Sequence, residues 1–399
     1  MLESDKRLVE LHHLACEKGS KYQRRRDFFD LVRQQSGKHF TAIVGPRGVG
    51  KTVVLQQLAA LDEEAFYLSS DTLGGQDLFE VVKRLVQRYG ARSFLIDEIH
   101  FAADYPAALK RMYDFLDVRV VFTSSVSLSL LASAQDLSRR VRTLYLRPFS
   151  FREYLVFTRD QELPQLTLDD IVGRRWSQEH LLAEPWFSHY LQGGLMPFAL
   201  EEPDVPVLLE AILDRIVNRD IPAVARLLVE ELGLIRQLLR FIGRAQVDGI
   251  NYSSLSRNIG ITKYKAEAYV GLLERSFVLT RTLPAGTNVM REPKVLMSVP
   301  YRLLYRELED AIGGLREDFV VGMLQAAAFE VDYLKSTRGG KTPDYLVRTP
   351  EGELVIEVGG KGKGRTQFKG VSVERKIILS DGGGPQGSRR PLHLLGFIA

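Results

Sequence analysis

The chain has 399 residues, more than the roughly 250–300 at which one hydrophobic core stops growing, and its 45% hydrophobic and 26% charged residues exclude wholesale disorder. The net charge of +4 is too small to indicate a nucleic-acid binder by itself, and the single cysteine, Cys16, excludes an intrachain disulfide. Residues 1–20 lack the apolar core of a secretory signal and no long uncharged apolar run follows, so we expect a cytoplasmic protein with no membrane span.

Residues 1–150 predict an α/β nucleotide-binding domain. Short runs rich in β-branched and aromatic residues alternate there with helical stretches, the order that a parallel sheet covered by helices requires. The expected strands are Phe40–Val44, Phe66–Ser69, Phe94–Asp97, Val118–Thr123 and Thr143–Leu146.

Three further domains are expected after this one. Helical periodicity punctuated by prolines indicates a helical lid domain over residues 151–248. Residues 249–303 predict a winged-helix domain, because Ile259-Gly260-Ile261 is a short turn between the helices Ser254–Asn258 and Lys263–Glu274. Residues 304–399 predict a second α/β block. Its expected elements are the helix Glu317–Ala328, the strands Val331–Leu334, Asp344–Val347 and Leu354–Val358, and a closing strand, Leu392–Phe397.

A phosphate-binding loop is predicted between the first strand and the next helix, because residues 45–52 match G-x-x-x-x-G-K-[ST] in that setting. Its glycines let backbone N–H groups approach phosphates, Lys51 reaches the β- and γ-phosphates, and Thr52 ligates Mg²⁺. The predicted ligands are therefore ATP and Mg²⁺. The predicted nucleotide-binding residues are Gly45, Pro46, Arg47, Gly48, Val49, Gly50, Lys51 and Thr52.

Two acids end the apolar run Phe94–Asp97 and supply the expected hydrolytic chemistry. Asp97 would hold Mg²⁺ through water, and Glu98 would polarise the attacking water. Residues 97–100, Asp-Glu-Ile-His, are similar to the D-E-x-H box of helicases. No second helicase lobe follows, so we expect a supporting role for His100.

Two candidate groups that act on the γ-phosphate follow further along the chain. Ser124 ends the fourth strand, where its hydroxyl would sense the γ-phosphate or the attacking water, although hydroxyls also end strands for ordinary turn reasons. Arg139, Arg140 and Arg142 lie between that strand and the next. One of them, with Arg140 preferred, is expected either to complete a neighbouring subunit's site as an arginine finger or simply to decorate a helix end.

Together these motifs resemble the AAA+ superfamily of P-loop ATPases. More narrowly, they resemble a bacterial and archaeal family whose C-terminal domain of unknown function has a restriction-endonuclease-like core. The resemblance rests on residues 45–52, 97–98, 121–125, 137–141, 148–154 and 191–197. It implies ATPase activity. A homo-oligomer is expected because an arginine near residue 140 can complete the site only if a neighbouring subunit presents it. In the family the segment before the last sheet strand usually ends in Gly-Arg, whereas here Arg139 replaces the glycine and Arg140 keeps the arginine position.

The resemblance also implies a nuclease-like fold at the C-terminal end. Such nucleases place an acid on a helix, Pro-Asp on one strand and Asp/Glu-x-Lys on the next. Glu317, Asp344 and Glu357 match the acids, but Gly359 stands where the lysine belongs. We therefore expect a degenerate domain that binds without cleaving. Lys361, in the glycine- and lysine-rich loop that follows, is the candidate replacement for the lysine.

The helix-turn-helix is the other nucleic-acid signal. Arg257, Lys263 and Lys265 surround its second helix and are candidate DNA contacts, although such modules also serve as packing or interaction elements. The favoured function is a Mg²⁺-dependent ATPase that couples ATP binding and hydrolysis to DNA binding or remodelling. The alternatives are a nucleotide-dependent protein-interaction or defence switch and an ATP-gated Mg²⁺ nuclease.

Overall fold

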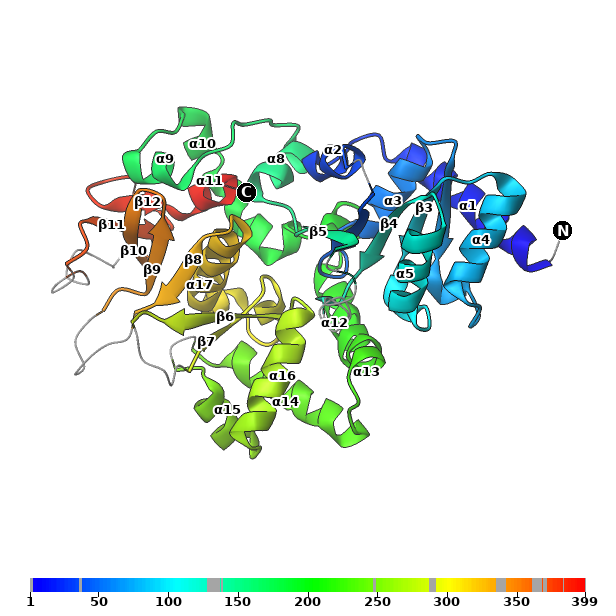
Figure 1. Ribbon diagram of the computed structural model, residues 1–399. Coiled ribbons are helices and arrows are strands. Elements are labelled where there is room, and N and C mark those ends of the chain that lie inside the picture. The colour runs from blue at the N-terminus through cyan, green and yellow to red at the C-terminus, as the bar shows by residue number, and fades with distance from the viewer. Residues whose placement is uncertain are drawn as a thin grey trace. The chain divides into compact units, whose positions relative to one another are not determined.

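The chain forms two compact units in the computed structural model (Figure 1). The first consists of Met1–Pro148 and Asn218–Arg226, and the second of Phe149–Val217 and Leu227–Ala399. The structure describes residues 3–35, 38–127, 137, 139–246, 249–286, 292–334, 342–360, 368, 372–382 and 384–398. Among the described helices, none combines the length and the apolar character that a bilayer crossing requires.

The first unit is a parallel sheet covered by helices, as its alternating sequence predicts. The five strands lie in the order β2-β3-β4-β1-β5, and each neighbouring pair is parallel. The chain crosses from β1 to the far edge and then returns, so right-handed crossovers place α3 on one face and α4 and α5 on the other. The strands are β1 (Phe40–Val44), β2 (Ala65–Ser69), β3 (Ser93–Asp97), β4 (Arg119–Ser124) and β5 (Val141–Tyr145). The helices are α1 (Glu3–Lys21), α2 (Asp27–Arg33), α3 (Lys51–Ala59), α4 (Leu78–Tyr89), α5 (Tyr105–Phe115) and α13 (Ile221–Val224), with single turns η1 (Ser70–Thr72) and η2 (Ile99–Phe101).

The centre of this sheet is its most buried part. Strands β1 and β3 are buried along their whole length, which explains why they read as uninterrupted apolar runs. By contrast, β5 lies at one edge and its side chains are partly or fully exposed. It begins at Val141, earlier than the expected start at Thr143.

The second unit begins with short helices. Ser150 caps α8 by accepting a hydrogen bond from the backbone of Glu153, whose carboxylate accepts one from the backbone of Ser150 in return. The helices are α8 (Phe151–Arg159), α9 (Leu168–Gly173), α10 (Gln178–Leu182), α11 (Glu184–His189), η3 (Tyr190–Gly194), η4 (Pro197–Leu200), α12 (Val205–Arg215), η5 (Ile216–Asp220), whose last residues lie in the first unit, and α14 (Val229–Arg244).

A helix-turn-helix follows and leads into a large sheet. Helices α15 (Tyr252–Ile259) and α16 (Lys263–Arg275) meet at Gly260, whose φ of 74° is in the left-handed region that favours glycine. An antiparallel hairpin of β6 (Leu279–Pro284) and β7 (Lys294–Met297) comes next. Strand β6 also pairs in parallel with β8, so the hairpin belongs to one seven-stranded sheet, ordered β12-β11-β10-β9-β8-β6-β7.

The last block differs from expectation at its start and its end. Helix α17 begins at Leu308, not at Glu317, and the expected closing strand Leu392–Phe397 is wrong, because that segment is the 3₁₀ helix η8. Its residues are buried, and a short buried apolar run fits a helical turn as well as a strand. The remaining elements are η6 (Tyr301–Leu304), α17 (Leu308–Ala326), β8 (Glu330–Tyr333), β9 (Tyr345–Thr349), β10 (Gly352–Gly359), β11 (Arg375–Ser380) and β12 (Arg389–Pro391).

Candidate nucleotide-binding site

The loop between β1 and α3 has the backbone shape that phosphate binding needs. Gly48 and Gly50 have φ values of 81° and 88°, which glycine adopts at little steric cost. Gly50 is the N-cap of α3, so the unpaired N–H groups of the first turn and the positive end of the helix dipole lie at this loop. A Cβ at Gly45 would collide with the carbonyl oxygen of Leu146, so that position also requires glycine.

Lys51 is folded into the loop. Its Nζ donates hydrogen bonds to the carbonyl oxygens of Gly45, at 2.8 Å, and Pro46, at 2.7 Å. Burial lowers the pKa of Lys51 to about 8. The ammonium is thus held among neutral acceptors in the loop, and the negative phosphates of a nucleotide would bind it more strongly.

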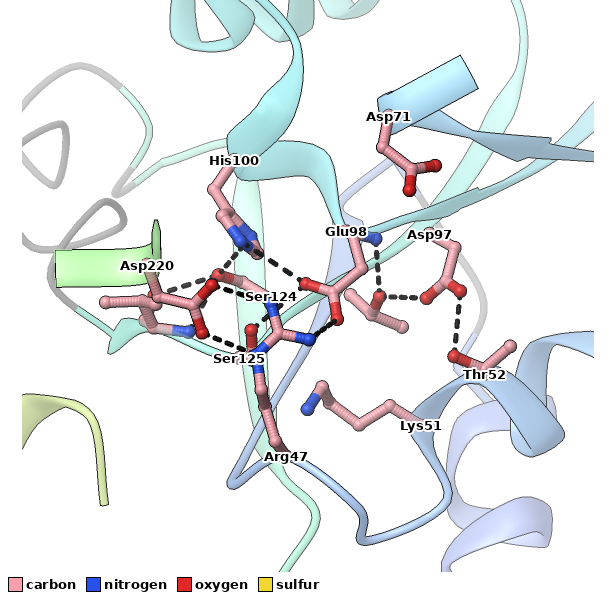
Figure 2. A network of polar contacts seen from close by, with 12 residues as sticks. Arg47, Lys51, Thr52, Asp71, Asp97, Glu98, His100, Ser124, Ser125 and Asp220 are labelled. Carbon is pink, nitrogen blue, oxygen red and sulfur yellow. Dashed lines mark hydrogen bonds and ion pairs between the residues drawn. The ribbon is translucent and has the colours of Figure 1, made fainter. Parts of the chain in front are cut away.

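Asp97 is fixed by three hydroxyl groups at the end of β3, of which Figure 2 labels the one from Thr52. Thr52 Oγ1 donates to one carboxylate oxygen at 2.8 Å, and Tyr67 donates to the same oxygen at 3.1 Å. Thr123 Oγ1 donates to the other oxygen at 2.5 Å. Burial raises the pKa of Asp97. The Thr52 hydroxyl and the Asp97 carboxylate are hard oxygen ligands, the type that Mg²⁺ prefers, so the residues fit the ion.

Glu98 has an uncommon backbone conformation. Its φ of 50° and ψ of 49° are in the left-handed region, which is rare for a residue with a side chain. A 2.9 Å hydrogen bond from the Glu98 backbone N–H to Thr123 Oγ1 holds this turn. Backbone strain of this kind clusters at functional sites, where it aims a side chain.

The Glu98 carboxylate is surrounded by polar groups. One oxygen accepts a hydrogen bond from Arg47 Nη1 at 3.1 Å, and the other accepts one from Ser125 Oγ at 3.0 Å. His100 Nε2 lies 3.3 Å from that second oxygen, and burial lowers the pKa of His100. Burial alone would raise the pKa of Glu98, but the charges of Lys51 and Arg47 outweigh it, so the pKa is lowered.

Two contributors to the site were missed by sequence reasoning. Asp220 accepts two hydrogen bonds from the Arg47 guanidinium, at 2.5 and 2.7 Å, from a fully buried position. Tyr67 supports Asp97 from β2. Arg47 was counted as a member of the loop but not as a link between carboxylates. An aspartate far along the chain carries no local signal that it pairs with a P-loop arginine.

Ser124 and Arg140, the two candidates for acting on the γ-phosphate, each contact other residues of the first unit. Ser124 Oγ donates to the carbonyl oxygen of Val126 at 2.8 Å and lies 3.4 Å from His100 Nδ1, while its neighbours Thr123 and Ser125 bond the acids. Arg140 donates to Asp114 at 3.1 Å. Its guanidinium also lies over the ring of Tyr113, 5.5 Å from the ring centre, whereas Arg139 is exposed.

Residues 37–155 match the family model described as an AAA domain. This range contains the phosphate-binding loop, both acids and every strand from β1 to β5. The match and the parallel five-stranded sheet support an AAA+ P-loop ATPase fold, and we call the first unit the AAA unit. Residues 184–299 match a second model, a domain of unknown function designated DUF8612.

One relative in sequence and two solved structures are similar to this chain over most of its length. An uncharacterized protein of Methanocaldococcus jannaschii is 27% identical over 411 residues, which cover 90% of this chain and 86% of that protein. The solved Aeropyrum pernix ORC1 protein in complex with DNA is 15% identical and covers 81% of this chain and 94% of its own, with a TM-score of 0.29. The Thermotoga maritima RuvB Holliday junction branch migration motor is also 15% identical, covers 69% and 89%, and has a TM-score of 0.28. At such TM-scores the structural similarity says nothing about function.

The acids predicted for a nuclease site lie outside the AAA unit. Glu317 accepts hydrogen bonds from Lys294 and from the Tyr345 hydroxyl, both at 2.7 Å. Asp344 accepts one from the backbone of Val358 at 2.7 Å, and Glu357 is buried. In the described parts of the chain, three or more His, Cys, Asp or Glu residues are nowhere grouped so that they could hold a metal ion. Lys361 lies outside the described residues.

The candidate DNA-contact residues are on the surface of the helix-turn-helix. Lys263 forms an ion pair with Glu292, and Lys265 forms one with Glu231 at 3.3 Å. Arg257 is exposed at the end of α15. Exposed ion pairs contribute only about 0–1 kcal/mol, so phosphates could displace these acids from the lysines.

Proposed function

We propose that the protein is a Mg²⁺-dependent ATPase of the AAA+ class that couples ATP binding and hydrolysis to the binding or remodelling of DNA. The observation that carries the ATPase part is the 2.8 Å hydrogen bond between Thr52 and Asp97, because it joins the phosphate-binding loop to the acidic end of β3. A lysine and a hydroxyl at the start of α3 meet a carboxylate at the end of β3, as nucleotide hydrolysis requires.

Nucleotide binding would use the loop and the start of α3. The backbone N–H groups of the first helical turn and the Lys51 ammonium bind the β- and γ-phosphates. Lys51 exchanges two carbonyl oxygens for phosphate oxygens, which gains charge-assisted hydrogen bonds. Thr52 and Asp97 would hold Mg²⁺, which would supply positive charge against the negative charge that develops during transfer.

Hydrolysis would use Glu98 as the group that orients and deprotonates water. The water oxygen forms a bond to the γ-phosphorus while the bond from that phosphorus to the oxygen bridging to ADP breaks. ADP leaves with the electron pair of that bond, and Glu98 accepts the proton of the water. Ser125 and His100 restrict the orientation of the carboxylate, because both contact its second oxygen.

Self-association is part of this proposal. An arginine finger acts on the γ-phosphate of a neighbouring subunit, so the segment ending at Arg140 would contribute to catalysis only in an oligomer. The exposure of Arg139, and of the edge strand β5 that follows it, is consistent with a surface that meets another copy.

DNA coupling is tested by ATP turnover measured with single-stranded, duplex and branched DNA, with mass photometry on the same samples. Turnover stimulated by at least one DNA form supports the proposal. Unchanged turnover and no binding to any of them at low salt, with ATP and Mg²⁺ present, would favour a switch whose partner is another protein. We also propose that residues 249–303 form a winged-helix domain, because a helix-turn-helix is followed there by an antiparallel hairpin. The DNA experiment tests whether this domain contacts DNA.

For residues 304–399 we propose a restriction-endonuclease-like domain that no longer cleaves. Helix α17 is followed by antiparallel β8, β9 and β10 and then by β11, parallel to β10. The Glu317 carboxylate is already bonded to Lys294 and Tyr345, and Gly359 replaces the lysine. Labelled DNA with Mg²⁺ should therefore stay intact. Cleavage that disappears in Asp344→Ala and Glu357→Ala would contradict this view and promote the ATP-gated nuclease.

A further inference from the structure

Arg47 shares its guanidinium between two carboxylates of the AAA unit (Figure 2). Nε and Nη2 donate to the two oxygens of Asp220, and Nη1 donates to Glu98 at 3.1 Å. The bond to Asp220 is bidentate, the geometry in which arginine holds a carboxylate most firmly. The bond to Glu98 is single and longer. Arg47 is therefore anchored at Asp220 and is easier to detach from Glu98.

Asp220 is itself fixed in the AAA unit. It belongs to the segment 218–226, which packs with this unit although the chain on both sides of it belongs to the other. Arg219 lies over the ring of Phe101, 4.6 Å from its centre, and Ile221 is fully buried. Three consecutive side chains thus hold the segment in place, and the middle one reaches the phosphate-binding loop.

The arrangement matters because Glu98 is the proposed proton acceptor. While Arg47 donates to Glu98, one oxygen of the carboxylate is occupied by a positive group, which makes the carboxylate a poorer acceptor. We propose that Asp220 is a positioning residue that acts on Glu98 through Arg47: its carboxylate holds the arginine so that Nη1 can move from Glu98 to an incoming phosphate. This inference rests on the proposed ATPase function.

Asp220→Asn tests the proposal because it removes the competing charge with little change in volume. Arg47 should then stay with Glu98, so kcat should fall about tenfold while KM for ATP stays within about threefold. Asp220→Glu keeps the carboxylate and should restore part of kcat, because Arg47 again has a second anionic partner. A structural role alone would lower the folded fraction and leave kcat per folded molecule unchanged.

Arg47→Gln removes the side chain that links Asp220 to Glu98. Adding Asp220→Asn to this variant should then change kcat less than about twofold, because the route from Asp220 to Glu98 is already cut. The double variant also removes both buried charges together, so it remains informative if Asp220→Asn alone does not fold.

Several outcomes would overturn the inference. These are a kcat per folded molecule that is unchanged in Asp220→Asn, or independent losses that multiply in the double variant. Asp214→Asn is the matched control, since Asp214 pairs with Arg236 at an exposed position on α12, and it should leave both kcat and KM for ATP unchanged. Normal turnover in Glu98→Gln would instead contradict the proposed function itself, so the two failures are distinguishable.

Discussion

The Thr52 hydroxyl donates a 2.8 Å hydrogen bond to Asp97 and so connects the start of α3 to the end of β3. In sequence the two residues are separated by β2 and α4, yet parallel strands with crossover helices bring their ends to the same edge of the sheet. The sheet edge where Thr52 meets Asp97, the helix-turn-helix and the surface near β5 can each be tested by substitution.

Lys51 and Glu98 should fail in different ways when replaced. Lys51→Ala removes a phosphate-binding charge and should weaken ATP binding about 100-fold or more. Glu98→Gln should bind ATP within about threefold of the wild type but lose about 100-fold in turnover, because only the proton acceptor is gone. Glu17→Gln, an exposed substitution on α1, is the control. Equal turnover in Glu98→Gln and the wild type would remove the site assignment.

ATP affinity should depend on pH above about pH 8. Burial lowers the pKa of Lys51 to about 8 in the free protein, and bound phosphates would raise it. Below this pKa the ammonium is already protonated and affinity should be nearly constant. Above it, binding must take up a proton, so Kd should rise up to about tenfold per pH unit. Calorimetry in buffers of different ionisation enthalpy measures both effects. In Lys51→Arg the proton uptake should vanish, because arginine stays charged. Equal uptake there would contradict the assignment.

Arg140 can be separated from its intramolecular partner. If Arg140 serves a neighbouring subunit, Arg140→Ala should lower turnover about tenfold or more and leave ATP affinity nearly intact. Asp114→Ala breaks the same ion pair but keeps the arginine, and should have little effect. Equal losses in the two variants would mean that the ion pair matters only within one subunit. Full activity of a strictly monomeric protein would exclude a finger, and a loss confined to Arg139→Ala would move the role to that residue.

DNA binding should weaken as salt rises if the helix-turn-helix contacts phosphates. Removing Lys263 and Lys265 together should reduce the slope of log affinity against log salt by about 2 units, similarly for different sequences. Glu231→Gln frees Lys265 from its partner and should strengthen binding at low salt. Lys18→Ala, on α1, is the control. A slope unchanged by the double substitution would place the DNA surface elsewhere, with Arg257→Ala the next variant to measure.

Sequence alone predicted the nucleotide-binding half of the site because its signals are local. A strand, a glycine loop, a lysine and a hydroxyl lie consecutively, and β1 has the bounds that its apolar run predicts. The parallel sheet of the AAA unit is confirmed. The end of β3 at Asp97 was predicted for the same reason, because an apolar run stops at a charged residue.

The other parts of the site and of the fold depend on long-range contacts, which leave no local pattern in the sequence. Asp220 lies between ordinary helical residues, and only the folded chain brings it to Arg47. Likewise β11 pairs in parallel with β10, and this place in the sheet could not be read from periodicity. The segment Leu392–Phe397 was assigned to the wrong element because an apolar run of six residues records burial and not the backbone conformation.

The position of segment 218–226 has a consequence for how the protein is made. Because these residues complete the AAA unit, a chain emerging from the ribosome cannot finish that unit when it reaches Pro148; it must wait until residue 226 has been synthesised. During that interval Arg47 has no Asp220 to neutralise it. A fragment that ends at Pro148 would leave Arg47 without this partner, so a fragment meant to retain the Arg47–Asp220 ion pair has to include residues 218–226, either in the intact chain or joined by a linker.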